Sequence, residues 1–291
     1  MRRDFLELRS SLRSIHNWIL LLGATFGIGV YLPTLFTRGA GVQIGGIPQP
    51  ILSLLAIGLA VRQLKHQRNR NEPEIEDQWL GSGLVLGGLA LFYSYYPAIA
   101  PQFFSCVVIL VGGVLSDQGW KFLRRYWVAI ALLSASLHPN WERIARHLWA
   151  VFVPSDALAE WMAWGGSWVL KAIGQPITRQ EEFLILPAGS VEVASGCDGF
   201  SMSLVVAISA VMIGLAFRVR GWAIAQLIAI GIGMAVILNV FRIAVMVLAA
   251  VYWGKESFEF WHGTIGGQIF SGILFTLYHY AIQPILDPKK S

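Results

Sequence analysis

The chain has 291 residues, of which 55% are apolar and only 13% are charged, against roughly 25% charged in a typical globular protein. A mean hydropathy of +0.59 excludes a water-soluble enzyme, because the apolar runs are long enough to cross a bilayer. Two cysteines exclude a disulfide scaffold. The net charge of +5 is distributed as membrane orientation requires, so it does not indicate a nucleic-acid partner.

Apolar runs of about 20 residues have the length that an α-helix needs to cross the hydrocarbon layer. The third and fourth runs are joined by a tight turn at Tyr95-Tyr96-Pro97, whose aromatic residues suit a membrane interface. The sequence predicts an all-α integral membrane protein with eight transmembrane helices, at about residues 17–36, 47–64, 79–96, 98–115, 121–138, 199–217, 222–241 and 264–283.

Lysines and arginines determine the predicted orientation of these spans. With the N-terminus inside, 15 of the 22 basic residues fall on the inner side, as the positive-inside rule requires. These inner residues lie within five short segments: 1–13, 62–70, 121–125, 218–220 and 289–290. Both termini are therefore expected to be cytoplasmic.

The segment 139–198 is the only sizeable extramembrane piece, and it is expected on the outer side. Three tryptophans within it recur at i, i+3 and i+7, which predicts a helix over about 155–173 with three indoles on one face: Trp161, Trp164 and Trp168. We expect this helix to be amphipathic and to lie in the outer headgroup layer. A ninth, poorly formed span is the alternative. A short β-hairpin over 183–193 then leads into the next loop.

These features divide the chain into three parts. Residues 1–138 form a five-helix membrane part, residues 139–198 form an extracytoplasmic segment, and residues 199–291 form a three-helix membrane part.

Three residues suited to acyl transfer are predicted to meet at the outer surface. Cys197 precedes the sixth span, and His262 precedes the eighth. Arg242 follows the inner loop by about 20 residues, one bilayer thickness, and interrupts an apolar run that continues to Trp253. A helix N-terminus at Cys197 is expected to lower the pKa of its thiol. The alternative interpretations are a packed cysteine, a snorkelling arginine and an interfacial histidine.

Other chemistries find little support in the sequence. No His or Cys spacing resembles a metal site, and neither an H-E-x-x-H motif nor a glycine-rich phosphate loop is present. We therefore expect no metal and no cofactor. Cys106 has no polar companion in its apolar span and is expected only to pack.

At three blocks the sequence resembles the exosortase/archaeosortase family of membrane cysteine transpeptidases. The family's common nucleophile block reads Ala-Cys-Ser-Gly, whereas Cys197 is followed here by Asp198, a departure that suggests a subgroup such as the cyanobacterial exosortases (cyanoexosortases). The matching blocks are Ala194-Ser195-Gly196-Cys197-Asp198-Gly199, Asn239-Val240-Phe241-Arg242-Ile243 and Trp261-His262-Gly263-Thr264-Ile265-Gly266.

The resemblance implies a protein-sorting enzyme of the bacterial plasma (inner) membrane, with its active site on the extracytoplasmic side. Its partners would be membrane lipid and secreted proteins that carry a C-terminal signal of the PEP-CTERM type. This signal consists of a short Pro-Glu-Pro-like motif, a transmembrane helix and a basic tail. The enzyme would cut near the motif and transfer the protein to a surface or lipid acceptor.

Amide transfer needs a nucleophile, a base and a group that stabilises an oxyanion. Cys197 is expected to be the nucleophile and His262 the general base and acid. Arg242 is expected to stabilise the oxyanion or to hold a substrate carboxylate. Asp198 would orient His262, repel competing anions or cap a helix. Asn239 is expected beside the site.

Three other functions remain open from the sequence. A membrane cysteine protease could hydrolyse the same thioester without any transfer. A transporter could use Arg242 as an ion contact within the membrane. An assembly factor would not depend on Cys197 at all.

Overall fold

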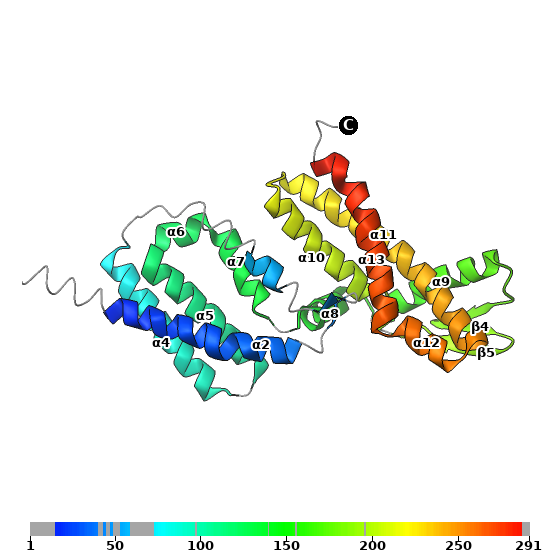
Figure 1. Ribbon diagram of the computed structural model, residues 1–291, viewed down its shortest axis with the longest axis horizontal. Coiled ribbons are helices and arrows are strands. Elements are labelled where there is room, and N and C mark those ends of the chain that lie inside the picture. The colour runs from blue at the N-terminus through cyan, green and yellow to red at the C-terminus, as the bar shows by residue number, and fades with distance from the viewer. Residues whose placement is uncertain are drawn as a thin grey trace, which may run out of the picture. The chain divides into compact units, whose positions relative to one another are not determined.

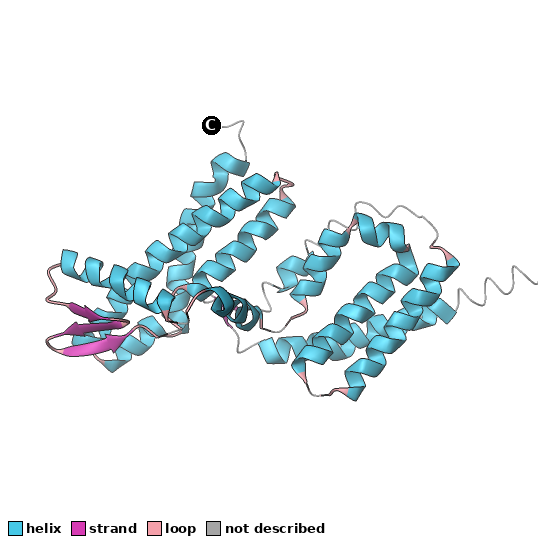
Figure 2. Ribbon diagram, turned by 180° about the vertical axis from the view of Figure 1, so that it is seen from behind, coloured by secondary structure: helices cyan, strands magenta, loops and turns pink. Residues whose placement is uncertain are grey.

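The computed structural model describes residues 15–39, 43–44, 47–48, 53–58, 73–96, 98–138, 140–154, 156–194 and 196–286. The chain is mostly helical and carries two small antiparallel sheets, of three and two strands (Figure 2). It forms two compact units, one from Met1–Val42 with Gln49–Pro139 and one from Gln43–Pro48 with Asn140–Ser291. The amino-terminal basic segment and the predicted inner loop at 62–70 lie outside the described residues.

The first unit is built on an antiparallel pair of helices, α4 (Ile75–Ser94) and α5 (Ile99–Gln118). They approach closely at Gly81, where an added Cβ would lie 2.5 Å from the Gly112 carbonyl oxygen. Small residues allow such close approach between membrane helices. A helix over 15–26 continues through η1 (Gly27–Tyr31) into α2 (Leu32–Gly39). It contributes to a shared apolar core of Phe26, Tyr31, Val85, Phe92, Cys106 and Ile109.

The predicted span 121–138 is wrong as a single helix. The chain forms two short helices instead, α6 (Trp120–Arg125) and α7 (Trp127–Ser136), separated by Tyr126 at φ −112° and ψ 24°. Three basic residues make α6 polar, and the ten residues of α7 are too few to cross a bilayer alone. The predicted span 47–64 lies mostly outside the described residues, although residues 53–58 are helical.

The second unit contains the predicted outer segment and the C-terminal membrane helices. Helices α10, α11 and α13 pack side by side (Figure 1) around a core that includes Val206, Leu227, Leu274 and Tyr278. The elements in chain order are β1 (Gln43–Ile44), β2 (Ile47–Pro48), α8 (Trp141–Phe152), α9 (Ala157–Ala172), β3 (Thr178–Gln180), β4 (Phe183–Leu186), β5 (Gly189–Glu192), α10 (Phe200–Ala216), α11 (Gly221–Leu248), η2 (Ala249–Trp253), α12 (Lys255–His262) and α13 (Thr264–Leu286).

Helix α9 forms at the tryptophan-rich stretch, and one of its faces is buried. Its three indoles are more than half exposed, whereas Met162, Ala163 and Leu170 on the opposite face are buried. Gly165 faces α11, where an added Cβ would lie 2.7 Å from Val240 Cγ2. The glycine pair in α9 is therefore a contact surface for α11.

The predicted hairpin also forms, as β4 and β5 joined by a two-residue turn. A third strand, β3, pairs with the other edge of β4. Leu184 and Leu186 of β4 and Val193 after β5 are buried in the same core as Cys197. The sheet therefore fixes the chain immediately before the nucleophile loop.

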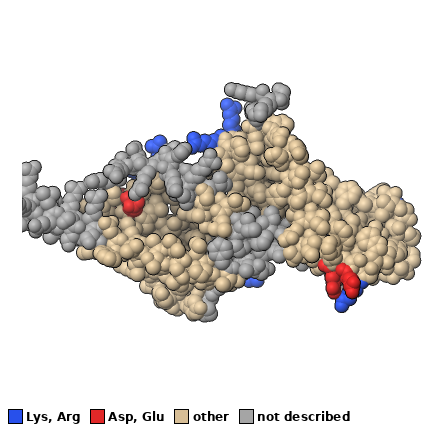
Figure 3. Space-filling view, viewed as in Figure 1, with Lys and Arg blue, Asp and Glu red and all other residues tan. Residues whose placement is uncertain are grey.

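Four helices of the described chain are long and apolar enough to cross a membrane: Ile15–Thr34, Ile99–Gln118, Gly221–Trp253 and Thr264–Leu286. Helix α10 is apolar but shorter, with 17 residues, so the number of eight spans is not confirmed. The predicted span 222–241 is too short, because the helix continues to Trp253 over 33 residues. On the face drawn in Figure 3 most of the described surface is uncharged, and the charged side chains are confined to a few small patches, as is expected of helices that contact lipid.

Candidate active site

The nucleophile candidate lies in a tight turn, Cys197-Asp198-Gly199, directly before α10. Gly199 adopts a left-handed conformation with φ of 77°, which glycine tolerates better than any other residue. An added Cβ there would also lie 3.0 Å from Asn239 Nδ2. The Cys197 amide donates a hydrogen bond to the Ala194 carbonyl at 2.8 Å. Backbone geometry thus holds Cys197 in one place.

Helix α11 holds the same turn from the other side. Asn239 is fully buried, and its Nδ2 donates a hydrogen bond to the Cys197 carbonyl oxygen at 2.8 Å. The structure therefore places Asn239 against the main chain of the nucleophile candidate.

Cys197 is 7% exposed and belongs to an apolar core with residues of α9 and α11, including Ala163, Ile243 and Val247. Burial raises the pKa of this thiol, the positive charge of Arg242 lowers it, and the negative charge of Asp198 raises it, so that the pKa lies above its ordinary value. The expected lowering of this pKa is wrong, because desolvation of the thiolate is the largest effect and outweighs the attraction of Arg242. The surroundings of Cys197 therefore favour the neutral thiol over the thiolate.

Arg242 of α11 contacts the end of α12, where His262 precedes the turn into α13. Arg242 Nη2 donates a hydrogen bond to the His262 carbonyl oxygen at 3.2 Å. The Nε of Arg242 and the Oδ1 of Asn239 are buried and have no hydrogen-bond partner among the described residues. Buried polar atoms without a partner are rare in native proteins. Both atoms are therefore available to a ligand.

His262 is the last residue of α12 and is exposed. It stacks on Phe258 with a ring separation of 5.2 Å and an angle of 17°. The corner that follows needs its glycines. An added Cβ at Gly263 would lie 2.6 Å from the Glu259 carbonyl oxygen, and one at Gly266 would overlap the Trp261 carbonyl oxygen.

These segments enclose a cavity of about 290 Å³. Arg242 and His262 line it together with Gly196 and Gly199, which flank the nucleophile candidate and its neighbour. The structure thus brings Asn239 and Arg242 of α11, His262 of α12 and the turn before α10 into one neighbourhood, and Cys197 and Asp198 lie in that turn without lining the cavity. No hydrogen bond joins the Cys197 thiol to the His262 ring in the described part of the chain. The full lining is Gly196, Gly199, Ser201, Met202, Asn239, Arg242, His262, Gly263, Thr264 and Gly267.

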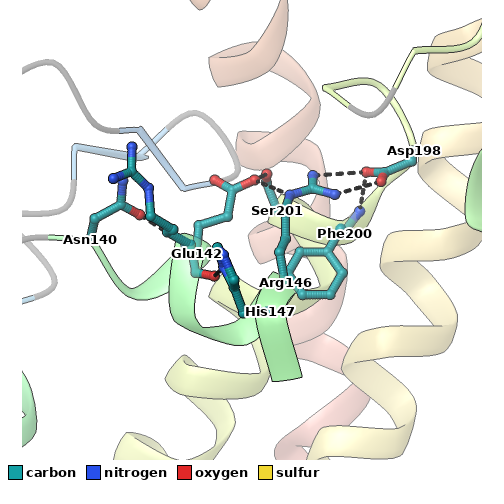
Figure 4. Close-up of polar contacts among 8 residues, drawn as sticks. Asn140, Glu142, Arg146, His147, Asp198, Phe200 and Ser201 are labelled. Atoms are coloured by element: carbon teal, nitrogen blue, oxygen red, sulfur yellow. Dashed lines mark hydrogen bonds and ion pairs between the residues drawn. The ribbon is translucent and has the colours of Figure 1, made fainter. Parts of the chain in front are cut away.

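Asp198 has partners that the sequence did not indicate (Figure 4). Its carboxylate accepts hydrogen bonds from Arg146 Nη1 at 2.7 Å, from Arg146 Nη2 at 3.1 Å and from the Phe200 amide at 3.0 Å. Asp198 therefore caps the start of α10 and pairs with α8, and none of its hydrogen bonds reaches His262. The i, i+4 spacing of Glu142 and Arg146 is a visible ion-pair signal, but nothing local connects it to a carboxylate 52 residues away.

No group of three or more His, Cys, Asp or Glu side chains among the described residues is arranged to hold a metal ion. The candidate site consists of an arginine, an imidazole and a carboxamide that line a small polar cavity, and of a buried thiol close enough to Arg242 to be affected by its charge.

Comparison with known proteins supports the resemblance read from the three sequence blocks. The family model for transmembrane exosortases (Exosortase_EpsH) matches residues 46–279, which is well over half of the chain and includes every residue of the cavity. No curated protein and no solved structure matches the chain. The chain therefore belongs to the transmembrane exosortase family.

Proposed function

We propose that this protein is a membrane cysteine transpeptidase that cleaves the C-terminal sorting signal of secreted proteins and transfers them to a surface or lipid acceptor. One observation carries the proposal. The cavity of about 290 Å³ collects Arg242, His262, Asn239 and the Cys197 turn from segments far apart in the sequence. Nucleophile, base and oxyanion stabiliser are the groups that acyl transfer needs.

The reaction begins with proton transfer from the Cys197 thiol to the His262 imidazole, because burial favours the neutral form of the thiol. The sulfur attacks the scissile carbonyl carbon, and the carbonyl oxygen becomes an oxyanion. When the C–N bond breaks, the imidazolium donates its proton to the leaving amine and a thioester remains. An O–H or N–H group of the acceptor then attacks the thioester carbonyl and gives its proton to the His262 imidazole. The C–S bond breaks, and the imidazolium returns the proton to the sulfur, which regenerates the thiol.

Arg242 is suited to the oxyanion because a guanidinium remains charged at all relevant pH values. Its Nε proton has no partner among the described residues, and its Nη2 is already held by the His262 carbonyl. The unpaired Oδ1 of Asn239 could accept a substrate N–H. These two atoms offer a peptide one donor and one acceptor.

A second, apolar cavity of about 620 Å³ adjoins the site and shares Gly199 with it. Helices α9, α10 and α11 line it with side chains such as Trp161, Leu204 and Val236. We infer that the apolar helix of the signal lies here while its motif reaches the polar cavity. Ala207→Trp would fill this space, and it should abolish processing. Ala229→Trp on an exposed position of α11 should not. Equal processing by both variants would exclude this location.

The proposed orientation places the site on the extracytoplasmic side of the plasma (inner) membrane, with both termini cytoplasmic. The exposed indoles of α9 would then lie in the outer headgroup layer. Single cysteines at 178–190 and 255–260 on a Cys-free background should react with an impermeant reagent from outside, and one at 219 only from inside. External labelling at 219 would invert this orientation.

The decisive experiment is co-expression with a secreted protein that ends in a Pro-Glu-Pro-like motif, an apolar helix and a basic tail. Mass spectrometry then identifies the new C-terminus. An acceptor attached to the cut C-terminus supports transpeptidation, whereas a free carboxylate indicates a protease that only hydrolyses. Cleavage that persists in Cys197→Ala would refute the cysteine mechanism and leave a transporter or assembly factor to be considered.

A further inference from the structure

Helix α8 reaches the nucleophile turn through a single arginine. Arg146 places two guanidinium nitrogens on the two oxygens of Asp198, at 2.7 Å and 3.1 Å. The Asp198 side chain is only 3% exposed and that of Arg146 29%. A paired contact of this kind fixes both distance and orientation, which a single contact does not.

The arginine is itself held in place by its surroundings (Figure 4). Its Nε donates to Glu142 Oε1 at 3.0 Å, and its guanidinium carbon lies 4.6 Å from the centre of the Phe200 ring. Glu142 Oε1 also accepts the Ser201 hydroxyl at 2.5 Å. Helix α8 is thus joined to the first turn of α10 at two points. Asn140 Oδ1 caps α8 by accepting the Arg143 amide at 2.9 Å.

We propose that Arg146 is a positioning residue for Cys197, which holds the Asp198 carboxylate in place and offsets its negative charge one residue from the nucleophile. The inference rests on the proposed function, in which Cys197 attacks the substrate. An unpaired carboxylate at this position would repel both the thiolate that attacks and the oxyanion that forms in the attack. The pairing with Arg146 offsets part of this repulsion and leaves the cap that Asp198 provides for α10 in place.

The charged groups around Cys197 make the effect of the Arg146–Asp198 pair on the thiol measurable. Asp198 lies beside it in the turn, Arg242 approaches from α11, His262 from α12, and Arg146 with Glu142 from α8. Helix α9 contributes Met162, Ala163 and Leu170 to the apolar core that contains Cys197. Burial and Asp198 raise the pKa of the thiol, while Arg242 lowers it. Any change that uncovers the Asp198 charge should therefore raise the pKa further.

The test follows alkylation of Cys197 by iodoacetamide across pH in the full-length protein, with the Cys197 peptide quantified by mass spectrometry. Arg146→Met keeps the apolar stem but removes the charge, and it should move the midpoint of the profile upward by about one pH unit. At a fixed pH below the midpoint, alkylation and substrate processing should both fall about tenfold. The matched control, Arg143→Met, changes an exposed arginine on the same helix and should follow the parent profile.

The double variant Arg146→Met/Asp198→Asn separates charge from folding. It replaces an ion pair by two neutral side chains, a change that proteins often tolerate, and it should return the midpoint to the parent value or below. A double variant with the midpoint of Arg146→Met would overturn the proposal. So would an Arg146→Met protein that loses thermal stability but keeps the parent midpoint, because that result describes a purely structural contact.

Two further controls keep the result decisive. If Arg146→Met does not fold, Arg146→Lys and the double variant are compared instead. The lysine, which keeps the charge, must then hold the midpoint near the parent value but process more slowly. Alkylation requires no substrate, so it is independent of the proposed function. If Cys197→Ala still processes substrate while Arg146→Met shifts the midpoint, the proposed function fails and the coupling of Arg146 to Cys197 stands.

Discussion

The side-chain amide of Asn239 is hydrogen-bonded to the main-chain carbonyl of Cys197, with 2.8 Å between Nδ2 and the oxygen. Arg242 lies three residues later on α11, and residues three apart share one face of a helix. The two side chains accordingly line the same cavity. This relationship gives the Asn-x-x-Arg spacing a physical reason, because one face of α11 both holds the Cys197 turn and places the Arg242 guanidinium at the cavity.

The first prediction concerns this hydrogen bond. Asn239→Ala leaves the buried Cys197 carbonyl without its donor, which should lower the free energy of unfolding by about 1–3 kcal/mol. Processing should fall at least about tenfold, because a turn that is no longer held places the sulfur less accurately. Thermal unfolding in detergent and a processing assay measure the two effects. Gln226→Ala, on an exposed position of α11, should leave both unchanged.

The two cysteines provide the second prediction. Cys197→Ala and Cys197→Ser should fold and insert normally but abolish processing, because only Cys197 lies beside the charged groups of the cavity. Cys106 lies in the apolar core of the first unit, and Cys106→Ala should process at nearly the parent rate. Western blotting of substrate and enzyme from the same membranes separates activity from expression. Parental activity in Cys197→Ala would contradict the cysteine mechanism.

Arg242 provides the third prediction. If it stabilises an oxyanion through its planar guanidinium, lysine cannot reproduce the paired donors. Loss of one such donor costs roughly 10²–10³ in rate. Arg242→Lys should therefore express normally but process substrate at least about a hundredfold more slowly. Arg220→Lys, on an exposed residue before the same helix, should keep the parent rate. Near-parental turnover by Arg242→Lys would show that the arginine only snorkels.

The fourth prediction is a pH dependence. Because burial raises the pKa of Cys197, a higher pH is needed to form the thiolate of Cys197 than to form that of an ordinary cysteine. Alkylation of Cys197 should thus have a midpoint above that of a free thiol measured alongside. Arg242→Met removes the charge that lowers this pKa, so its midpoint should lie higher than that of the parent. A lower midpoint in Arg242→Met would contradict the placement of Arg242 beside the thiol.

The fifth prediction concerns the corner that carries His262. Gly266→Ala adds a methyl group that overlaps the Trp261 carbonyl oxygen, so α13 must shift against α12. Processing should fall at least about tenfold, since small displacements of a catalytic group are costly. Gly272→Ala in the same helix meets no atom within 4 Å and should process normally. Measured in parallel, the two alanines distinguish the corner from a general effect of glycine replacement in α13.

Several features of this protein follow from the sequence alone, because they depend on local composition and spacing. Apolar length predicts the helices around α5, α11 and α13, since lipid leaves the backbone few alternatives. The tryptophan spacing predicts α9, and the turn residues predict the β4–β5 hairpin. The three motif blocks identify the family. Each of these signals lies within a few neighbouring residues.

Tertiary structure alone decided what surrounds the thiol. The sequence places Cys197 near a helix N-terminus, which favours a thiolate, but packing of α9 and α11 buries the sulfur and raises its pKa instead. The partner of Asp198 lies 52 residues earlier, on a helix with no motif of its own. Desolvation and ion pairing depend on which distant segments meet in space. The spacing of residues within one segment does not show which distant segments pack against it. The raised pKa of Cys197 and the contact of Asp198 with Arg146 therefore became visible only in the folded chain.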